Sequence, residues 1–277
     1  MREGFPPRRL PAPLTPRPDR PRSFRRVFAR EDDVLRLRAI LFDKDGTLID
    51  FDATWGPAAF AVMRELADGD GEALRRLMQV SEYVETERRF LPTSPLVAGS
   101  SAHYGPLWAQ VLGREAGPGF FGLMDDLFRV HGLANLAPIG DPAGVAAALR
   151  ARGLRLGIAT NDAEASARAQ AKALGLDAHM SFIAGYDSGH GSKPQPGMVS
   201  AFAAAQGLAP REVALVGDSI HDLHAARAAG ARAIAVLTGP LGESAHAHLA
   251  PHADHMLGSI ADLAALVDAL ERASPSA

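Results

Sequence analysis

The sequence predicts an α/β fold, in which a parallel sheet carries helices on both faces and a helical segment is inserted near the start. Short apolar runs, typical of strands buried on both faces, alternate with helical segments from Pro138 onward. Strands that alternate with helices in this way indicate a parallel sheet. Residues 51–135 break the alternation, because their apolar residues recur at helical spacing. A chain of 277 residues therefore suggests one domain with an insertion, or two domains.

The expected elements can be placed in chain order. The first strand is the apolar run 39–42, and residues 47–49 return to an extended pattern. Helical spacing then covers 58–66, 72–90, 105–112 and 120–130, which indicates four or five helices. After these we expect helix 142–152, strand 154–159, helix 163–174, strand 180–184, helix 195–206, strand 213–216, helix 220–229 and strand 233–237.

Two carboxylates follow the first strand, where charged side chains are unusual. Asp43 and Asp45 lie at the carboxyl end of the run 39–42, and strand alternation directs both side chains the same way. Gly46 then allows the backbone to turn. An ordinary turn is the alternative interpretation, since Asp-Gly is a common turn dipeptide.

A second buried strand ends in the same way and favours a functional site. The run 213–216 leads to Asp218, and Asp222 lies one helical turn further along. In open parallel sheets, ligands bind beyond the carboxyl ends of the strands where the winding direction reverses. If the two strands are neighbours, these carboxylates meet Asp43 and Asp45 in one crevice, and their repulsion implies a bound cation. Oxygen ligands and the absence of cysteine favour Mg²⁺ over zinc.

Four segments of the chain together form a recognisable pattern. In chain order they are Asp43-Lys44-Asp45-Gly46-Thr47, then Thr160-Asn161, then Lys193, and last Asp218 with Asp222. This pattern resembles the motifs of the haloacid dehalogenase superfamily of phosphohydrolases, in its phosphoglycolate phosphatase-like branch. The resemblance extends over about residues 39–270. It implies a Rossmann-like core of residues 36–50 and 136–277, with an α-helical cap domain inserted at residues 51–135.

The resemblance implies a phosphatase that works through a covalent intermediate. Asp43 would attack phosphorus to form an aspartyl-phosphate, while Asp45 would protonate the leaving oxygen and then take a proton from water. Mg²⁺ would be held by Asp43, the backbone carbonyl of Asp45 and Asp218. Asp222 would act through water or through another ligand. The implied substrate is a small phosphorylated metabolite, with phosphoglycolate as one candidate.

Phosphate binding is implied for Thr160, Asn161 and Lys193, which offer a hydroxyl, an amide and a fixed positive charge. Composition supports the choice of Lys193, because the chain uses arginine almost exclusively and has only two other lysines, Lys44 and Lys172. A compact ammonium that points at one phosphoryl oxygen is not replaced by a forked guanidinium without moving atoms. Lys172, on an expected helix, is interpreted as a solvated surface residue.

Lys44 is a further phosphate-binding candidate with two open interpretations. Strand alternation predicts that its side chain points away from those of Asp43 and Asp45. The turn at Gly46 would instead direct it toward the cap, where it pairs with a second anionic group of the substrate, such as a carboxylate. In the other interpretation, Lys44 pairs with a carboxylate of the core or the cap.

Composition excludes several classes of protein. A net charge of -3 gives no reason to expect a nucleic-acid partner, and the absence of cysteine excludes disulfides and thiolate metal sites. No apolar run approaches the roughly 20 residues that span a bilayer. We therefore expect a soluble, cytoplasmic protein with no membrane partner. Its oligomeric state stays open.

Residues 1–35 and the cap have their own signals. Proline and arginine alternate in residues 1–35, which predicts a disordered arm; a transit peptide and an overlong start are the alternatives.

Within the cap, the candidates for substrate specificity are Trp55, Arg88, Arg89, His103 and Tyr104. Other histidines are interpreted as solvated or surface residues rather than as a catalytic base or a metal cluster, namely His190, His246, His248, His252 and His255.

Three rival functions remain to be weighed. A phosphomutase would share the aspartyl-phosphate but pass the phosphoryl group to a sugar hydroxyl. A haloacid dehalogenase needs neither Asp45 nor magnesium, so Asp45, Thr47 and Asp218 argue against it. A non-catalytic binding module would be expected to lack a motif residue, and all of them are present.

Overall fold

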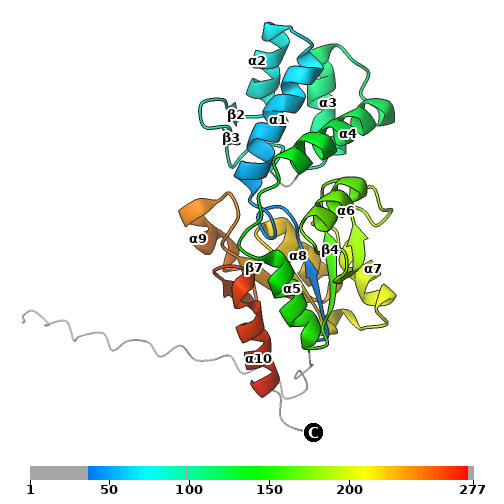
Figure 1. Ribbon diagram of the computed structural model, residues 1–277, viewed down its shortest axis with the longest axis vertical. Coiled ribbons are helices and arrows are strands. Elements are labelled where there is room, and N and C mark those ends of the chain that lie inside the picture. Colours follow the sequence, from blue (N-terminus) through cyan, green and yellow to red (C-terminus); the bar gives the residue numbers. More distant parts are fainter. Residues whose placement is uncertain (1–36, 98, 274–277) are drawn as a thin grey trace, which may run out of the picture. The chain divides into compact units, whose positions relative to one another are not determined.

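The computed structural model describes residues 37–97 and 99–273. The arm predicted over residues 1–35 lies outside the described residues. Six strands form one sheet in the order β5-β4-β1-β6-β7-β8, and every neighbouring pair is parallel. The strands are β1 Ala39–Phe42, β4 Arg155–Ala159, β5 Met180–Ala184, β6 Val213–Gly217, β7 Arg232–Val236 and β8 His255–Leu257 (Figure 1).

β1 lies inside this sheet, and the strand order reverses beside it. β4 and β5 extend the sheet on one side, and β6, β7 and β8 extend it on the other. Phe42, the last residue of β1, is opposite Ile158 of β4 and Val216 of β6. The strands that precede Asp43 and Asp218 are therefore neighbours, which is the condition for a shared crevice, and their carboxyl ends are level.

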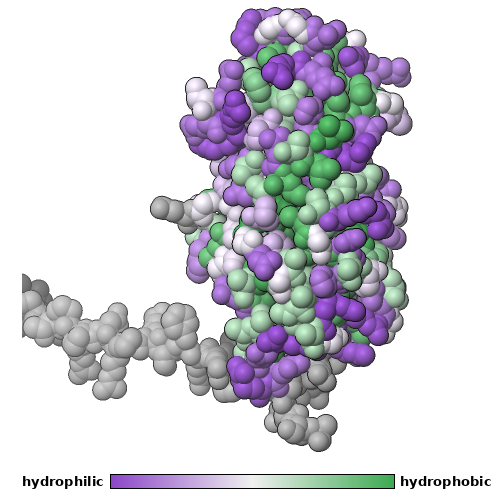
Figure 2. Space-filling model, viewed as in Figure 1, coloured by the Kyte–Doolittle hydropathy of each residue, from purple (hydrophilic) through white to green (hydrophobic). Residues whose placement is uncertain are grey.

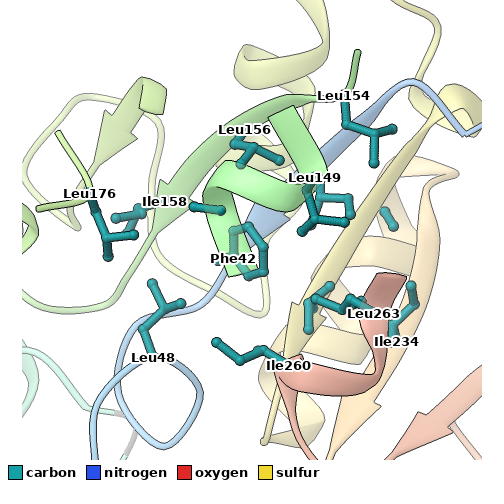
Figure 3. Packing of buried hydrophobic residues seen from close by; sticks show 14 of the residues in the cluster. Phe42, Leu48, Leu149, Leu154, Leu156, Ile158, Leu176, Ile234, Ile260 and Leu263 are labelled. Carbon is teal, nitrogen blue, oxygen red and sulfur yellow. The ribbon is translucent and has the colours of Figure 1, made fainter. Parts of the chain in front are cut away.

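Alternation along the strands directs side chains into two hydrophobic layers, one on each face of the sheet. Ile40 and Phe42 belong to the layer under α5, α6 and α10, and Figure 3 shows Phe42 beside Leu149 of α5. Ala39 and Leu41 belong to the layer under α7, α8 and α9. These helices are α5 Pro142–Ala151, α6 Glu164–Ala173, α7 Gly197–Ala205, α8 Ile220–Ala229, α9 Ala245–Leu249 and α10 Leu263–Ala273. The predicted sheet with helices on both faces is confirmed.

Four helices and a short hairpin occupy residues 51–134, which we call the α1–α4 segment. Its elements are α1 Phe51–Ala67, α2 Gly71–Val80, β2 Tyr83–Val84, β3 Arg89–Phe90, α3 Ser101–Leu112 and α4 Pro118–Ala134. They bury a hydrophobic cluster of their own. At its centre, Trp108 is fully buried and donates from Nε1 to Ser81 Oγ at 2.9 Å. α4 packs on α1 and also on α6 of the sheet layer.

Helical spacing predicted helix over residues 72–90, and this prediction is wrong beyond Val80, where α2 ends. There the chain forms the β2–β3 hairpin instead. The Ser81 carbonyl accepts a hydrogen bond from Ser94 Oγ at 2.6 Å, and the Tyr83 hydroxyl donates to the Gly56 carbonyl at 2.8 Å. These partners are distant in sequence, so the local pattern did not indicate the hairpin. The sequence also missed β8 and α10, which complete the sheet and one of its layers.

The surface of the described residues is mixed in polarity. Figure 2 shows apolar residues gathered over α4 on the viewed face, and this helix exposes Leu123, Val130 and Leu133. Among residues 37–97 and 99–273, no helix combines the length and the apolar character that crossing a membrane requires. Short 3-10 helices complete the described secondary structure at Pro210–Glu212, Gly242–Ser244 and Ile260–Asp262.

The contact between α1 and the hairpin generates a stability prediction. A Cβ added at Gly56 would lie 1.7 Å from the Arg88 carbonyl oxygen. Gly56→Ala should therefore displace the hairpin and lower the free energy of unfolding by about 1–3 kcal/mol, as overpacking does. Urea denaturation measures this change.

A matched control is Gly122→Ala in α4, where an added Cβ meets nothing within 4 Å. Because alanine favours the helix over glycine, this variant should gain roughly 0.5–1 kcal/mol. Equal effects of the two substitutions would contradict the packing of the hairpin on α1.

Candidate active site

The loop after β1 brings the two acidic motifs together. The Asp43 backbone N–H donates to the Val216 carbonyl at 2.8 Å, which fixes the start of the loop on β6. Gly46 turns the chain with φ of +77°, and a Cβ there would lie 2.5 Å from a carboxylate oxygen of Asp218. Thr47 Oγ1 donates to the same carboxylate at 3.4 Å. Glycine at position 46 is therefore required both by the turn and by the close approach of Asp218.

Asp43, Asp218 and Asp222 form a buried carboxylate cluster. One carboxylate oxygen from each of these residues lies within 4.8 Å of the other two. Their exposed fractions are 5%, 6% and 1%. Asp222 occupies the first turn of α8, where Ser219 Oγ donates to its carboxylate at 2.6 Å. The Asp45 carboxylate does not belong to this group of three.

Lys193 is the cation of this cluster. Its Nζ contacts Asp43 Oδ1 and lies 2.6 Å from Asp222 Oδ1. Burial alone would lower the pKa of Lys193, but Asp222 and Asp43 raise it above the ordinary value. The ammonium is therefore charged at neutral pH, and it balances one of three carboxylates.

Burial and the remaining negative charge shift the pKa values of two carboxyl groups in the cluster. Burial raises the pKa of Asp43 to about 7, opposed by Lys193 and reinforced by Asp222 and Asp45. Burial, with repulsion from Asp43 and Asp222, also raises the pKa of Asp218 well above its ordinary value. Within this cluster of three carboxylates, Asp43 and Asp218 thus bind protons more strongly than ordinary carboxyl groups do. The same oxygen-rich set suits a hard divalent cation such as Mg²⁺, which would replace those protons.

Asp45 occupies a separate position beside the cluster. Its Oδ1 accepts hydrogen bonds from Lys44 Nζ at 2.8 Å and from Trp55 Nε1. Its Oδ2 accepts from Thr160 Oγ1 at 3.2 Å. Donors from the loop, from α1 and from the end of β4 therefore fix the orientation of this carboxyl group.

The end of β4 and the loop that carries Lys193 are joined by the Asn161 side chain. Its amide nitrogen donates to the Lys193 carbonyl at 3.0 Å, and its amide oxygen accepts from the Lys193 backbone N–H at 2.9 Å. These bonds use both ends of the amide to hold the lysine loop. The phosphoryl contact expected for Asn161 stays a prediction, and so does that of Thr160.

The structure decides between the two directions that the sequence left open for the Lys44 side chain. Strand alternation predicted that it points away from Asp45, but its Nζ pairs with Asp45 at 2.8 Å and with Asp162 at 3.1 Å. Gln170 of α6 accepts from the same nitrogen at 2.7 Å, and the Trp55 ring centroid lies 4.7 Å away. The loop turns immediately after β1, and the long side chain follows the turn. Lys44 is 2% exposed and pairs with protein carboxylates.

A pocket opens from the carboxylates toward the α1–α4 segment. It reaches Asp43, Asp45, Thr160, Asn161, Lys193 and Asp218. Of the five residues proposed for specificity, Trp55 and Tyr104 line it, whereas Arg88, Arg89 and His103 are not among the described lining residues.

Other sequence candidates lie elsewhere. Lys172 is exposed on α6, and His190 stacks on Phe182 with ring centroids 6.0 Å apart. His252 lies 3.2 Å from His224. Within the described part of the chain, the carboxylate cluster is the one group of three or more residues with metal-ligand geometry, so the histidines do not form another.

Several pocket residues escaped the sequence analysis. Asp162 directly follows Thr160 and Asn161, so its position in the motif was a usable signal. Asp125 of α4 and Tyr186 after β5 also line the pocket, and the Tyr186 hydroxyl donates to Asp125 at 2.7 Å. No local pattern indicates this pair, because it depends on how α4 meets the sheet.

Comparisons with known proteins agree with this fold. The chain is 34% identical over 204 residues to a phosphoglycolate phosphatase from Chromobacterium violaceum, which covers 72% of this chain and 85% of the relative. A solved structure described as a predicted phosphoglycolate phosphatase from Haemophilus somnus has a TM-score of 0.61 at 20% identity, over 83% of this chain and 97% of its own.

A second solved structure is CbbY from Rhodobacter sphaeroides in complex with phosphate. Its TM-score is 0.57 at 21% identity, over 82% of this chain and 96% of its own. At such identities the two structures support the fold alone. Residues 37–230 match the family described as haloacid dehalogenase-like hydrolase. This match covers more than half of the chain, and with the relative from Chromobacterium violaceum it shows that the chain belongs to the haloacid dehalogenase-like hydrolase family.

Proposed function

We propose that this hydrolase is a Mg²⁺-dependent phosphatase that cleaves a small phosphate monoester through an aspartyl-phosphate intermediate. The observation that carries the proposal is the buried cluster of Asp43, Asp218 and Asp222 around Lys193, at the switch point of the sheet. Asp45 lies beside it without belonging to it. One carboxylate is thus available for attack and another for proton transfer.

The chemistry divides into two transfers. An oxygen of Asp43 attacks phosphorus, the bond from phosphorus to the ester oxygen breaks, and the Asp45 carboxyl gives its proton to the leaving alcohol. The Asp45 carboxylate then accepts a proton from water, whose oxygen attacks phosphorus. The bond to Asp43 breaks, inorganic phosphate leaves, and Asp45 is protonated again. Lys193 orients Asp43 through its contact with Oδ1 and supplies fixed positive charge.

The residues present fit a magnesium ion. Asp43 and Asp218 would hold it, and Asp222, already paired with Lys193, would act through water. When bound, the ion supplies positive charge that offsets charge on the transferring group. The raised pKa values of Asp43 and Asp218 support this assignment: burial is their largest cause, repulsion between carboxylates adds to it, and a cation relieves that repulsion.

The α1–α4 segment is proposed to act as the cap. It contributes Trp55, which binds Asp45, and Tyr104 and Phe128, which line the pocket. A cap in this place excludes water and selects the leaving group. The relative from Chromobacterium violaceum is named phosphoglycolate phosphatase, so phosphoglycolate is one candidate substrate.

Removal of the nucleophile tests the mechanism. Asp43→Asn should lower the turnover of a generic aryl phosphate at least about a thousandfold, because the covalent step is lost. Release of inorganic phosphate measures hydrolysis and separates it from transfer to a sugar hydroxyl in a phosphomutase. Activity that survives both this substitution and EDTA would contradict the mechanism.

Removal of one proposed metal ligand tests whether repulsion among the clustered carboxylates destabilises the metal-free fold. The raised pKa of Asp218 means that its ionised form destabilises the metal-free fold above that pKa. Asp218→Asn should therefore raise the melting temperature in EDTA, and more at pH 8 than at pH 5, where the wild-type carboxyl is more fully protonated. Saturating Mg²⁺ should raise the wild-type melting temperature by about 5 °C and that of the variant much less. An equal response of both proteins to Mg²⁺ would remove Asp218 from the ion site.

Lys44 is proposed to position Asp45 rather than to bind substrate. Lys44→Met should reduce kcat by roughly 10- to 100-fold on both an aryl phosphate and phosphoglycolate, with little change in KM. Lys172→Met, on the exposed face of α6, is the matched control and should leave both substrates unaffected. A rise in KM confined to phosphoglycolate would show instead that Lys44 contacts the substrate carboxylate.

A further inference from the structure

The pocket beyond the carboxylate cluster has an aromatic wall. This wall consists of side chains from the α1–α4 segment, namely Phe51, Trp55, Phe90, Tyr104 and Phe128. Leu96 and Val97 extend the apolar surface. The phosphoryl group belongs at the end of the pocket with Asp43 and Lys193, so the organic part of the substrate must lie against this wall.

The charged groups around the pocket are almost all negative. Among the described lining residues, Lys193 is the only lysine or arginine, and it contacts Asp43 and Asp222. The aspartates of the lining are Asp43, Asp45, Asp125, Asp162 and Asp218. The ammonium of Lys44 lies behind the lining and is held by Asp45, Asp162 and Gln170.

Polar groups at the pocket are neutral or acidic. Asp125 accepts a hydrogen bond from the Tyr186 hydroxyl at 2.7 Å. The hydroxyl groups of Ser101 and Tyr104 lie 3.4 Å apart. His221 is the other basic side chain of the lining. The described lining thus offers hydroxyl and carboxylate groups, and its one lysine, Lys193, is already paired with Asp43 and Asp222.

We infer that the preferred substrates are phosphate esters with an uncharged, aromatic or apolar organic part, rather than phosphorylated hydroxy acids such as phosphoglycolate. This inference rests on the proposed phosphatase function of the same site. A substrate carboxylate would lose water against the aromatic wall without gaining a countercharge. Asp125 would also repel it, so the pocket selects against it.

Matched substrate pairs isolate the effect of charge. Carbamoylmethyl phosphate is the neutral isostere of phosphoglycolate, and 4-carbamoylphenyl phosphate is that of 4-carboxyphenyl phosphate. At pH 8 with saturating Mg²⁺, the full-length protein should show kcat/KM at least about tenfold higher for the amide in each pair. Equal kcat/KM values within a pair, or a higher value for the carboxylate, would overturn the inference. Hydrolysis of any of the four substrates that is lost in Asp43→Asn upholds the proposed phosphatase function separately.

A charge variant assigns the selectivity to the pocket. Asp125→Asn keeps an acceptor for Tyr186 and should lower the amide-to-carboxylate ratio by at least about threefold, because one repelling charge is gone. Asp126→Asn is the matched control, since its side chain is 72% exposed on the same helix and pairs with Arg129. An unchanged ratio in Asp125→Asn, or the same fall in both variants, overturns the role of the pocket charge.

Binding provides a readout that does not depend on turnover. Three phosphonates, which cannot be hydrolysed, serve as probes. Benzylphosphonate and 4-(carbamoylmethyl)benzylphosphonate have an uncharged organic part, whereas 4-(carboxymethyl)benzylphosphonate carries an additional carboxylate. Calorimetry with Mg²⁺ should give tighter binding of the two probes with an uncharged organic part than of the carboxylate. This order in a protein with no phosphatase activity would overturn the proposed function and leave the selectivity of the pocket standing. Tightest binding of the carboxylate would overturn the inference.

Discussion

Repulsion among Asp43, Asp218 and Asp222 is the constraint on which the rest of the site depends. Because the parallel strands have level carboxyl ends, these side chains lie together in one buried place. A single ammonium, that of Lys193, contacts Asp43 and Asp222 there. Burial, reinforced by the negative charges of Asp222 and Asp45, raises the pKa of Asp43 to about 7. A cation and a phosphoryl group can use this arrangement, because each interacts with charges that the fold has already assembled. The cluster therefore lowers the stability of the metal-free protein.

A second set of contacts joins the reaction centre to the α1–α4 segment. Asp45 accepts hydrogen bonds from Lys44 and from Trp55 of α1, and Lys44 in turn binds Gln170 of α6. The carboxyl group proposed for proton transfer is thus held by the same residues that line or support the pocket. One buried lysine thus links the orientation of Asp45 to the α1–α4 segment, which gives a physical reason for a cation between the two aspartates of the loop.

The sequence predicted the core well, because its signals are local. Strand 180–184 and helix 220–229 have the bounds that their apolar patterns indicate, and the four acidic residues follow two strands that proved to be neighbours. The sequence did not reveal the hairpin after α2, whose contacts with Gly56 and Ser94 come from other parts of the chain. It left the direction of Lys44 open, because alternation along a strand no longer applies once the loop turns. The pair of Asp125 and Tyr186 joins α4 to the end of β5, and only the packed fold brings the two together.

The central claim is that Asp43 becomes phosphorylated during turnover. Borohydride reduces an aspartyl-phosphate to homoserine, so peptide mass spectrometry after reductive quenching identifies the modified residue. The account predicts homoserine at position 43 in the presence of both substrate and Mg²⁺, and unmodified aspartate when either is left out. Phosphate release with no modification at position 43, or modification at Asp45 instead, would contradict it.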